Sequence, residues 1–256
     1  MIKWKLLLTT LPYVAAVTVV KALLEFLAHW GGVVDFGDIG PVLTGGVFLT
    51  GILLAGVMTD YKESEKLPGE LAGTLEGIEE ICLSIHAEKP TIALAPLHRG
   101  VHTLTGRLRD WIFKRATTED AHQAITTFHG LLVQATKEGS KTAGVAMGEV
   151  AKLRKCMQRI DVISRTGFLP PAYALLETMN VIIIGLALAA KFKTTLAEFI
   201  LVPFITLIYV YMLRLIRDID DPFDYAADGK QQGGAEVDLY PLEEYWQRLG
   251  KRVTPG

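Results

Sequence analysis

The sequence contains few cysteines, little net charge and none of the short motifs that mark common enzyme active sites. Its two cysteines, Cys82 and Cys156, both lie in the polar middle of the chain, so we expect reduced thiols and no disulfide framework. The formal net charge of -2 gives no indication of nucleic-acid binding. The sequence lacks a nucleophile elbow, a phosphate-binding loop, a dinucleotide fingerprint and an HExxH pair, which argues against an enzyme.

Apolar residues are abundant, and they are concentrated in four segments. Half of the chain is hydrophobic and the mean hydropathy is +0.31, which is high for a soluble protein. A helix needs about 20 apolar residues to cross a bilayer. The segments of that length are residues 6–27, 39–59, 168–190 and 196–215. No cleavage pattern follows the N-terminal MIKWK, so we interpret the first segment as a retained span.

The spacing of these segments predicts an all-α membrane protein with four transmembrane helices arranged as two hairpins. Short links place residues 1–61 in a first hairpin and residues 167–217 in a second. Residues 62–166 show amphipathic periodicity and predict a cytosolic helical region, with breaks at Lys89-Pro90, Pro96 and Gly139. Residues 218–256 predict an acidic cytosolic tail, in which PLEEYWQRL forms a short docking helix.

The distribution of basic residues predicts the orientation. The link over residues 28–38 contains no Lys or Arg, whereas Lys3 and Lys5 precede the first span and Arg214 and Arg217 close the fourth. The positive-inside rule therefore places both termini in the cytoplasm. Two residues in the second outer link, Lys191 and Lys193, run against this rule, and we interpret them as candidate cations at an outer pore mouth.

The second span carries an apolar stripe. Thr44, Phe48 and Ile52 are spaced four apart and share one helix face. In a symmetric oligomer such a stripe would ring the central axis and form a constriction that gates by dewetting. The alternative is that it faces lipid or a neighbouring helix, and periodicity alone favours this alternative.

Three ionisable residues fall inside the predicted spans, namely Lys21, Glu25 and Glu177. Such residues are functional candidates because a charge in the bilayer is costly. Lys21 and Glu25 lie four apart and can pair on one helix face. Glu177 and Lys21 are also the groups that a proton-coupled transporter would titrate.

Acidic and histidine clusters raise the question of metal binding. Hard oxygen ligands in a loop suit Ca²⁺, so Asp220, Asp221, Asp224 and Asp228 are candidate ligands. The spacing is not that of a twelve-residue calcium loop, and we favour a solvated turn that caps a membrane helix. For His98 and His102 we favour a solvated face over a metal site. No other cofactor is expected.

Several stretches resemble the bestrophin family of ion channels. FLTGILLAGVMT followed by DYKESEKLP is similar to the second transmembrane helix of that family. VPFITLIYVYMLRLIRDIDDPF resembles its last membrane helix, with Asp221-Pro222-Phe223 in place of Asn-Pro-Phe, and ISRTGFLPPAY is a weaker third match. The DPF ending followed by VDLYPLEEYWQRL looks like the divergent bacterial and plant branch.

The resemblance implies a homopentamer in which the second helix of each subunit lines one axial pore, continued by a cytosolic vestibule. Thr44, Phe48 and Ile52 take the positions of the apolar neck, which reverses the preference stated above. The family usually has larger apolar residues at all three positions, and Thr44 departs from this pattern. The acidic run of the calcium clasp is interrupted at Tyr225, which puts calcium gating in doubt.

The expected function is therefore passive ion conduction in a bacterial inner membrane or a plasma membrane. The family includes anion and cation channels, and Lys191 and Lys193 favour anions. The expected partners are the lipid bilayer, further copies of the chain and permeant ions. Two alternatives stay open, a membrane scaffold or accessory subunit without a pore, and the proton-coupled transporter.

Overall fold

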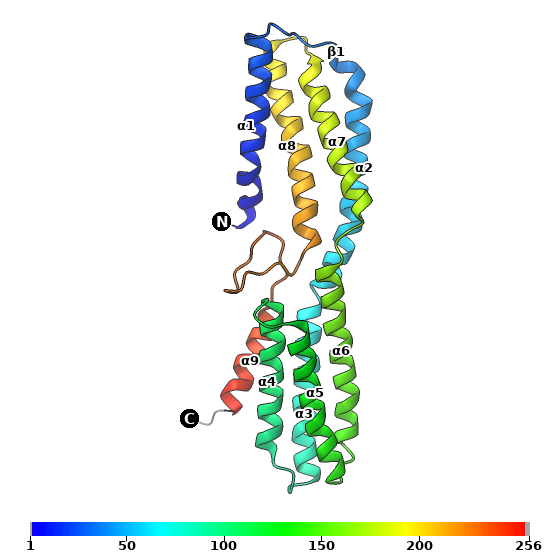
Figure 1. Ribbon diagram of the computed structural model, residues 1–256, viewed down its shortest axis with the longest axis vertical. Coiled ribbons are helices and arrows are strands. Elements are labelled where there is room, and N and C mark those ends of the chain that lie inside the picture. Colours follow the sequence, from blue (N-terminus) through cyan, green and yellow to red (C-terminus); the bar gives the residue numbers. More distant parts are fainter. Residues whose placement is uncertain (1, 254–256) are drawn as a thin grey trace. The chain divides into compact units, whose positions relative to one another are not determined.

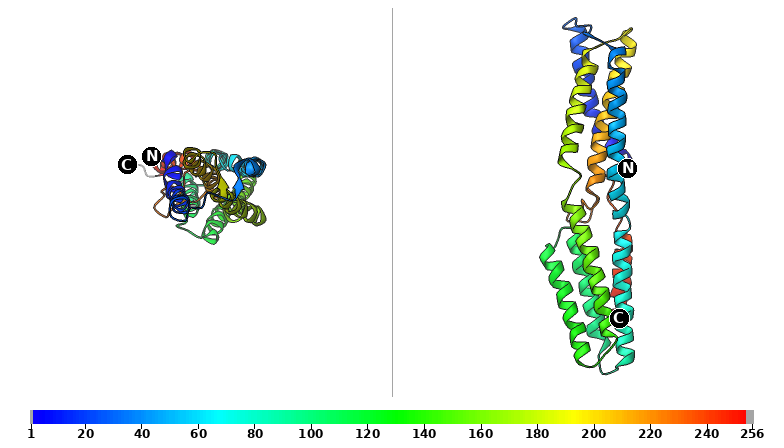
Figure 2. Two further views of the ribbon diagram at one scale, coloured as in Figure 1. Left: turned by 90° about the horizontal axis from the view of Figure 1, so that it is seen from above. Right: turned by 90° about the vertical axis from the view of Figure 1, so that its right-hand side faces the viewer.

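The protein is almost entirely helical, as the computed structural model of residues 2–253 shows (Figures 1 and 2). The expected all-α class with four long apolar helices is confirmed. Met1 and residues 254–256, which belong to the first and last expected segments, lie outside the described residues, as does the side chain of Lys3. The elements are α1 (Ile2–Phe26), β1 (Val34–Asp35), α2 (Phe36–Ser64), α3 (Leu67–Glu88), α4 (Leu94–Ile112), α5 (Thr118–Lys137), α6 (Ala143–Arg165), α7 (Pro170–Ala189), β2 (Ala190–Lys191), α8 (Thr195–Asp220) and α9 (Tyr240–Val253).

The chain forms two compact units. Residues 1–61, 167–221 and 233–235 form the first, which we call the membrane unit because it contains the apolar helices α1, α2, α7 and α8. Residues 62–166, 222–232 and 236–256 form the second, which we call the polar unit and which contains α3 to α6 and α9.

The membrane unit leaves most of its apolar surface uncovered. In the most apolar window of each long helix, only 11–28 % of the residues are buried within the chain. Such a surface is stable only when lipid or another subunit covers it. Within the unit, α8 packs against both α1 and α7, so that α1 contacts mainly α8 and not α2, its neighbour in sequence (Figure 1).

A close contact joins α2 to α7 and α8. The Tyr209 hydroxyl on α8 donates a hydrogen bond to the Leu43 carbonyl on α2 at 2.5 Å. At Gly46, a Cβ atom would lie only 2.6 Å from both this hydroxyl and the Ile183 side chain. Glycine at position 46 is therefore required for the approach of the helices.

The polar unit is a helical bundle with an apolar core. On α4, Leu97, Val101, Leu104 and Leu108 recur every three or four residues and are all buried, as expected for an amphipathic helix. Cys82 of α3 and Cys156 of α6 are free thiols in this core, and burial raises the pKa of each to about 12. Both are therefore inert packing residues.

The expected breaks between the helices of the polar unit are only partly correct. The structure ends α3 at Glu88, and Gly139 has a φ of +95° just after α5. Pro96, however, lies inside the first turn of α4. A break there is wrong because proline is tolerated in a first turn, whose N–H groups have no acceptor within the helix.

Glu88 joins the end of α3 to the start of α6. Its carboxylate accepts hydrogen bonds from the Ser140 hydroxyl at 2.7 Å and from the backbone N–H groups of Lys141 and Thr142 at 3.1 Å. These bonds stabilise the charged form and lower the pKa of Glu88 to about 2.

Candidate functional site

Helix α2 packs against the rest of the membrane unit through one narrow stripe of buried residues. Its buried residues in the apolar part are Ile39, Gly46, Thr50 and Val57, which are seven, four and seven positions apart. At about 100° per residue these positions lie on one side of the helix. Thr44, Phe48 and Ile52 fall on the opposite side by the same count. Phe48 is 67 % exposed and Ile52 is 52 % exposed, and Thr44 is also exposed, so the three predicted neck residues share one open face.

This face carries no charge. The Thr44 hydroxyl donates a hydrogen bond to the Gly40 carbonyl of its own helix at 3.1 Å, which occupies its proton and leaves the methyl group and the oxygen lone pairs outward. Phe48 and Ile52 add a phenyl ring and a branched alkyl group. The face is therefore largely apolar and is suited to a surface that excludes water.

The link between α1 and α2 is tied to the link between α7 and α8. The strands β1 and β2 run parallel, with Val34 opposite Ala190 and Asp35 opposite Lys191. Gly32 has a φ of +85°, and a Cβ atom there would lie 2.6 Å from the Ala190 carbonyl oxygen, so glycine is required at this crossing.

The two lysines predicted for the outer mouth are both exposed on this pair of links. Lys191 lies on β2, where Asp35 is its register partner, and Lys193 follows two residues later. The nearby Asp35 carboxylate lowers the positive potential around Lys191. Lys193 is therefore the stronger source of attraction for anions at this surface.

Lys21 is buried and forms an ion pair that the sequence does not predict. Its Nζ lies 2.5 Å from Oε1 of Glu198 in the first turn of α8, and Lys21 is only 1 % exposed. The same Nζ donates to the Leu188 and Ala190 carbonyls at the C-terminal end of α7, at 3.0 and 3.3 Å. The expected partner was Glu25, but the packing of α1 on α8 brings Glu198 to the lysine instead. Lys21 therefore joins α1, α7 and α8.

Glu177 has a different environment from Lys21. It pairs with Arg217 near the end of α8, and both side chains are about half exposed, at 50 % and 52 %. Because Glu177 and Lys21 bond to different partners, the structure does not bring together the two groups named for a proton-coupled transporter.

We expect Glu177→Gln to leave ion flux unchanged and to lower the free energy of unfolding, because it breaks the ion pair with Arg217. Flux into liposomes with and without a proton gradient tests this, together with thermal unfolding. Glu149→Gln, which breaks the Lys152 pair in the polar unit, is the matched control. Proton-driven flux that Glu177→Gln abolishes and Glu149→Gln preserves would favour the transporter.

Asp220, at the end of α8, is engaged with protein groups. Its carboxylate accepts hydrogen bonds from the Phe168 backbone N–H and from the Tyr173 hydroxyl, each at 2.8 Å. These bonds fix the start of α7 against the end of α8, which is a structural role.

The other acidic residues after α8 are directed to other partners. Asp221 is the C-cap residue of α8, and Asp224 pairs with Lys114 at 2.7 Å. Asp228 pairs with Lys230, whose hydrogen bond lowers the pKa of Asp228. Within residues 2–253, no group of three or more His, Cys, Asp and Glu side chains is placed to hold a metal ion. The structure therefore does not gather these four side chains into one cluster, and the calcium site stays a prediction.

The two histidines of α4 are covered by the tail helix α9, so a solvated histidine face is the wrong interpretation. The His102 ring stacks on Trp246 with 5.5 Å between centroids. His98 Nε2 lies 3.9 Å from Oε1 of the buried Glu79. The buried Tyr245 hydroxyl of α9 also approaches Glu79, at 3.3 Å from Oε2. The only sequence signal for this contact was the amphipathic pattern of the tail, because its partners lie far away in the chain.

Comparison with known proteins finds similarity in structure only. No protein-family model and no curated protein matches the sequence. A bacterial bestrophin homologue from Klebsiella pneumoniae has a TM-score of 0.72 at 12 % identity, covering 99 % of this chain and 97 % of that one. A point variant of that homologue has a TM-score of 0.75 at 11 % identity, covering 100 % and 99 %. A further structure, described as a membrane protein, has a TM-score of 0.77 at 11 % identity, covering 95 % and 98 %.

The TM-scores of 0.72–0.77 establish the fold, whereas identities of 11–12 % do not establish the activity. The similarity extends over nearly the whole of each chain, including the helical residues 62–166, which the sequence resemblance did not reach. It agrees with the four helices that are long and apolar enough to cross a membrane. The chain is an integral membrane protein with a bestrophin-like fold.

Proposed function

We propose that the protein is a passive ion channel, a homopentamer in which α2 of each subunit lines one central pore. The observation that carries this proposal is the open apolar face of α2, formed by Thr44, Phe48 and Ile52, opposite the stripe that packs on α7 and α8. The bestrophin-like fold supports the same assignment. It also supports a function other than catalysis.

In the pentamer, the three residues from each subunit form a narrow neck. Phe48 and Ile52 exclude water when the neck is tight, and small changes in diameter then decide whether the pore is wet and conducting. Thr44 has a smaller side chain than Phe48 or Ile52, so it makes one end of the neck wider and slightly more polar. The neck has no charged ring, so selectivity must arise outside it.

Anions are the proposed permeant ions. The exposed Lys191 and Lys193 raise the local anion concentration at the outer mouth, with Lys193 the more effective because Asp35 offsets Lys191. In this orientation both termini lie in the cytoplasm. The proposed location is a bacterial inner membrane or a plasma membrane.

The oligomeric state and the reversal potential test this function together. We expect the purified protein to have five subunits by light scattering in detergent. In a planar bilayer under a KCl gradient, it should give currents that reverse near the chloride equilibrium potential. Lys193→Gln should move the reversal potential toward zero, whereas Lys155→Gln, an exposed lysine of the polar unit, should not.

Other results would contradict the proposal in distinct ways. A monomer or dimer without flux would support the scaffold or accessory subunit. Currents that reverse near the potassium potential would keep the channel and exclude the anion preference.

A further inference from the structure

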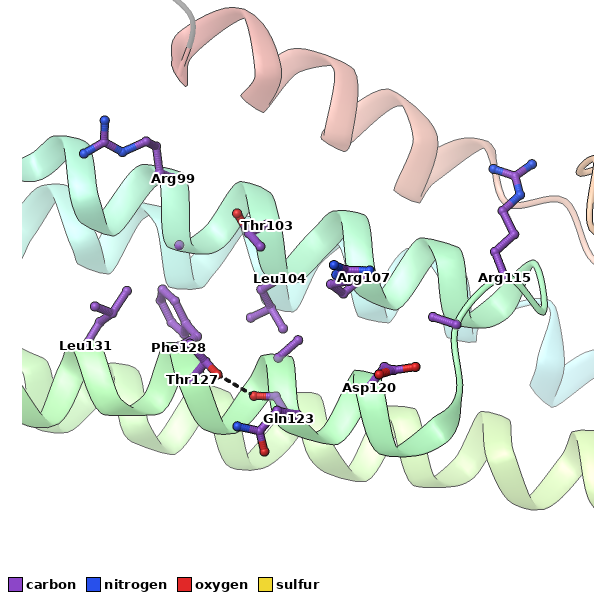
Figure 3. A pocket seen from close by; sticks show the side chains of 13 residues that line it. Arg99, Thr103, Leu104, Arg107, Arg115, Asp120, Gln123, Thr127, Phe128 and Leu131 are labelled. Carbon is purple, nitrogen blue, oxygen red and sulfur yellow. Dashed lines mark hydrogen bonds between the residues drawn. The ribbon is translucent and has the colours of Figure 1, made fainter.

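A groove of about 470 Å³ lies between α4 and α5 in the polar unit. Figure 3 shows its floor, where Leu104 of α4 points toward α5, and Phe128 and Leu131 of α5 point toward α4. The helices approach closely at Gly100, where a Cβ atom would lie 2.7 Å from the Leu131 side chain. The volume lies within the range of about 300–1,000 Å³ that is typical of small-molecule pockets.

The rim of this groove carries an excess of positive charge. Arg99, Arg107 and Arg115 line it, together with a single acidic residue, Asp120. The Asp120 carboxylate is already engaged as a helix cap, because it accepts hydrogen bonds from the Thr117 hydroxyl at 2.7 Å and from the Thr117 N–H at 2.9 Å. Asp120 stays negative and offsets Arg107 in part, and Arg115 is paired with Asp110, so the groove keeps a net positive charge that is smaller than three arginines would give.

Two of these arginines differ from most others in the polar unit. The arginines there that pair with a carboxylate are Arg109, Arg115, Arg159, Arg165, Arg248 and Arg252. Among the described residues, Arg99 and Arg107 form no close ion pair with a carboxylate. Asp120 is nevertheless near Arg107, and hydrogen bonds from Thr117 and, to a smaller extent, the Arg107 charge lower the pKa of Asp120. They lie eight residues apart, with Thr103 midway, on one face of α4.

Their directions assign them different roles. In Figure 3, Arg107 lies between Leu104 and Asp120, whereas the Arg99 and Arg115 guanidinium groups extend away from α5. Arg107 is thus placed to contact a bound group. Arg99 adds positive potential at one end of the groove.

We propose that this groove binds a small soluble organic anion that carries a phosphate or carboxylate on an apolar body the size of one ring. The anionic group bonds to the Arg107 guanidinium, whose planar fork matches two oxygens of such a group. The apolar body lies over Leu104, Phe128 and Leu131. The site lies wholly within the polar unit and does not depend on the proposed channel function.

Titration calorimetry on the full chain in a neutral detergent tests the site with phenyl phosphate as the probe. We expect binding with a Kd below about 1 mM. Inorganic phosphate should bind more weakly, and benzyl alcohol should give no signal beyond a blank of protein-free micelles. Arg107→Gln should weaken phenyl phosphate binding by about tenfold or more, since charge-assisted hydrogen bonds are lost.

Two further variants separate charge from shape. Ala124→Leu, which fills the groove without changing its charge, should reduce the affinity for phenyl phosphate to that for inorganic phosphate. Arg107→Lys keeps the positive charge but loses the paired N–H donors of the guanidinium, so it should weaken binding less than Arg107→Gln. It also tests the site if Arg107→Gln does not fold. Lys155→Gln, on α6 outside the groove, removes one exposed positive charge and should leave binding unchanged.

The proposal is overturned by any of three results in correctly folded protein. The first is no heat of phenyl phosphate binding above the blank. The second is an equal affinity for phenyl phosphate in the wild type and in the Arg107 variants. The third is an equal loss of affinity in Lys155→Gln and Arg107→Gln. The last result would show that net charge acts without a defined site.

Discussion

Phe48→Ala and Ile52→Ala increase ion flux through the reconstituted protein by about tenfold or more, if each lowers the barrier at the neck by about 1.4 kcal/mol. The substitution removes a large apolar group from every subunit of the ring, so the neck becomes wider and easier to wet. Single-channel conductance and open probability in planar bilayers measure the effect. Phe48→Ala should have the larger effect because the phenyl group is the bulkier and the more exposed of the two.

The chain offers matched controls for both substitutions. Phe204 and Ile200 on α8 are 56 % and 57 % exposed, so Phe204→Ala and Ile200→Ala remove the same side chains from another apolar surface of the membrane unit. We expect these controls to leave conductance unchanged. Unchanged currents in both α2 variants, or equal changes in the α8 controls, would show that the Thr44, Phe48 and Ile52 face does not line the pore.

Lys21→Met destabilises the membrane unit by about 3–5 kcal/mol, because it leaves the Glu198 carboxylate buried without its partner. It also removes the donor to the Leu188 and Ala190 carbonyls. Glu198→Gln should be destabilising for the reciprocal reason. Thermal unfolding in detergent measures both effects, with the fraction of protein that remains monodisperse as the signal.

The double variant decides whether the two residues act as a pair. We expect Lys21→Met with Glu198→Gln to recover stability relative to the sum of the single effects, with a coupling of about 1–3 kcal/mol. Lys193→Met, which changes an exposed lysine, is the control and should have little effect. Simple additivity of the two single variants would exclude the pair as a stabilising contact.

The sequence was sufficient to predict the helices of the membrane unit but not where each one ends. The uncharged residues 39–59 predict the second span, yet α2 extends from Phe36 to Ser64 because its charged end is also helical. Hydropathy detects the part that needs lipid, whereas a helix ends where its backbone geometry changes. Similarly, α7 begins at Pro170 and not at Phe168, since proline fits a first turn.

Contacts between distant residues were the part that the sequence could not supply. Spacing along one helix made Glu25 the natural partner of Lys21, whereas Glu198 is reached only because α1 packs on α8. In the same way His98 and His102 lie under α9, which a local pattern does not show. Periodicity did place Thr44, Phe48 and Ile52 on one face, but whether that face meets water or lipid depends on copies of the chain and stays a prediction.

The pairing of Lys21 with Glu198 also has a consequence for biogenesis. The ribosome makes the lysine with the first span and the glutamate with the last, so at about 5–20 residues per second the two are separated by roughly 10 to 35 s of translation. During this interval the lysine must keep its ammonium group among lipid headgroups or against the insertion machinery. The buried ion pair therefore forms only after the last span has been made, and the first span stays without its native partner until then.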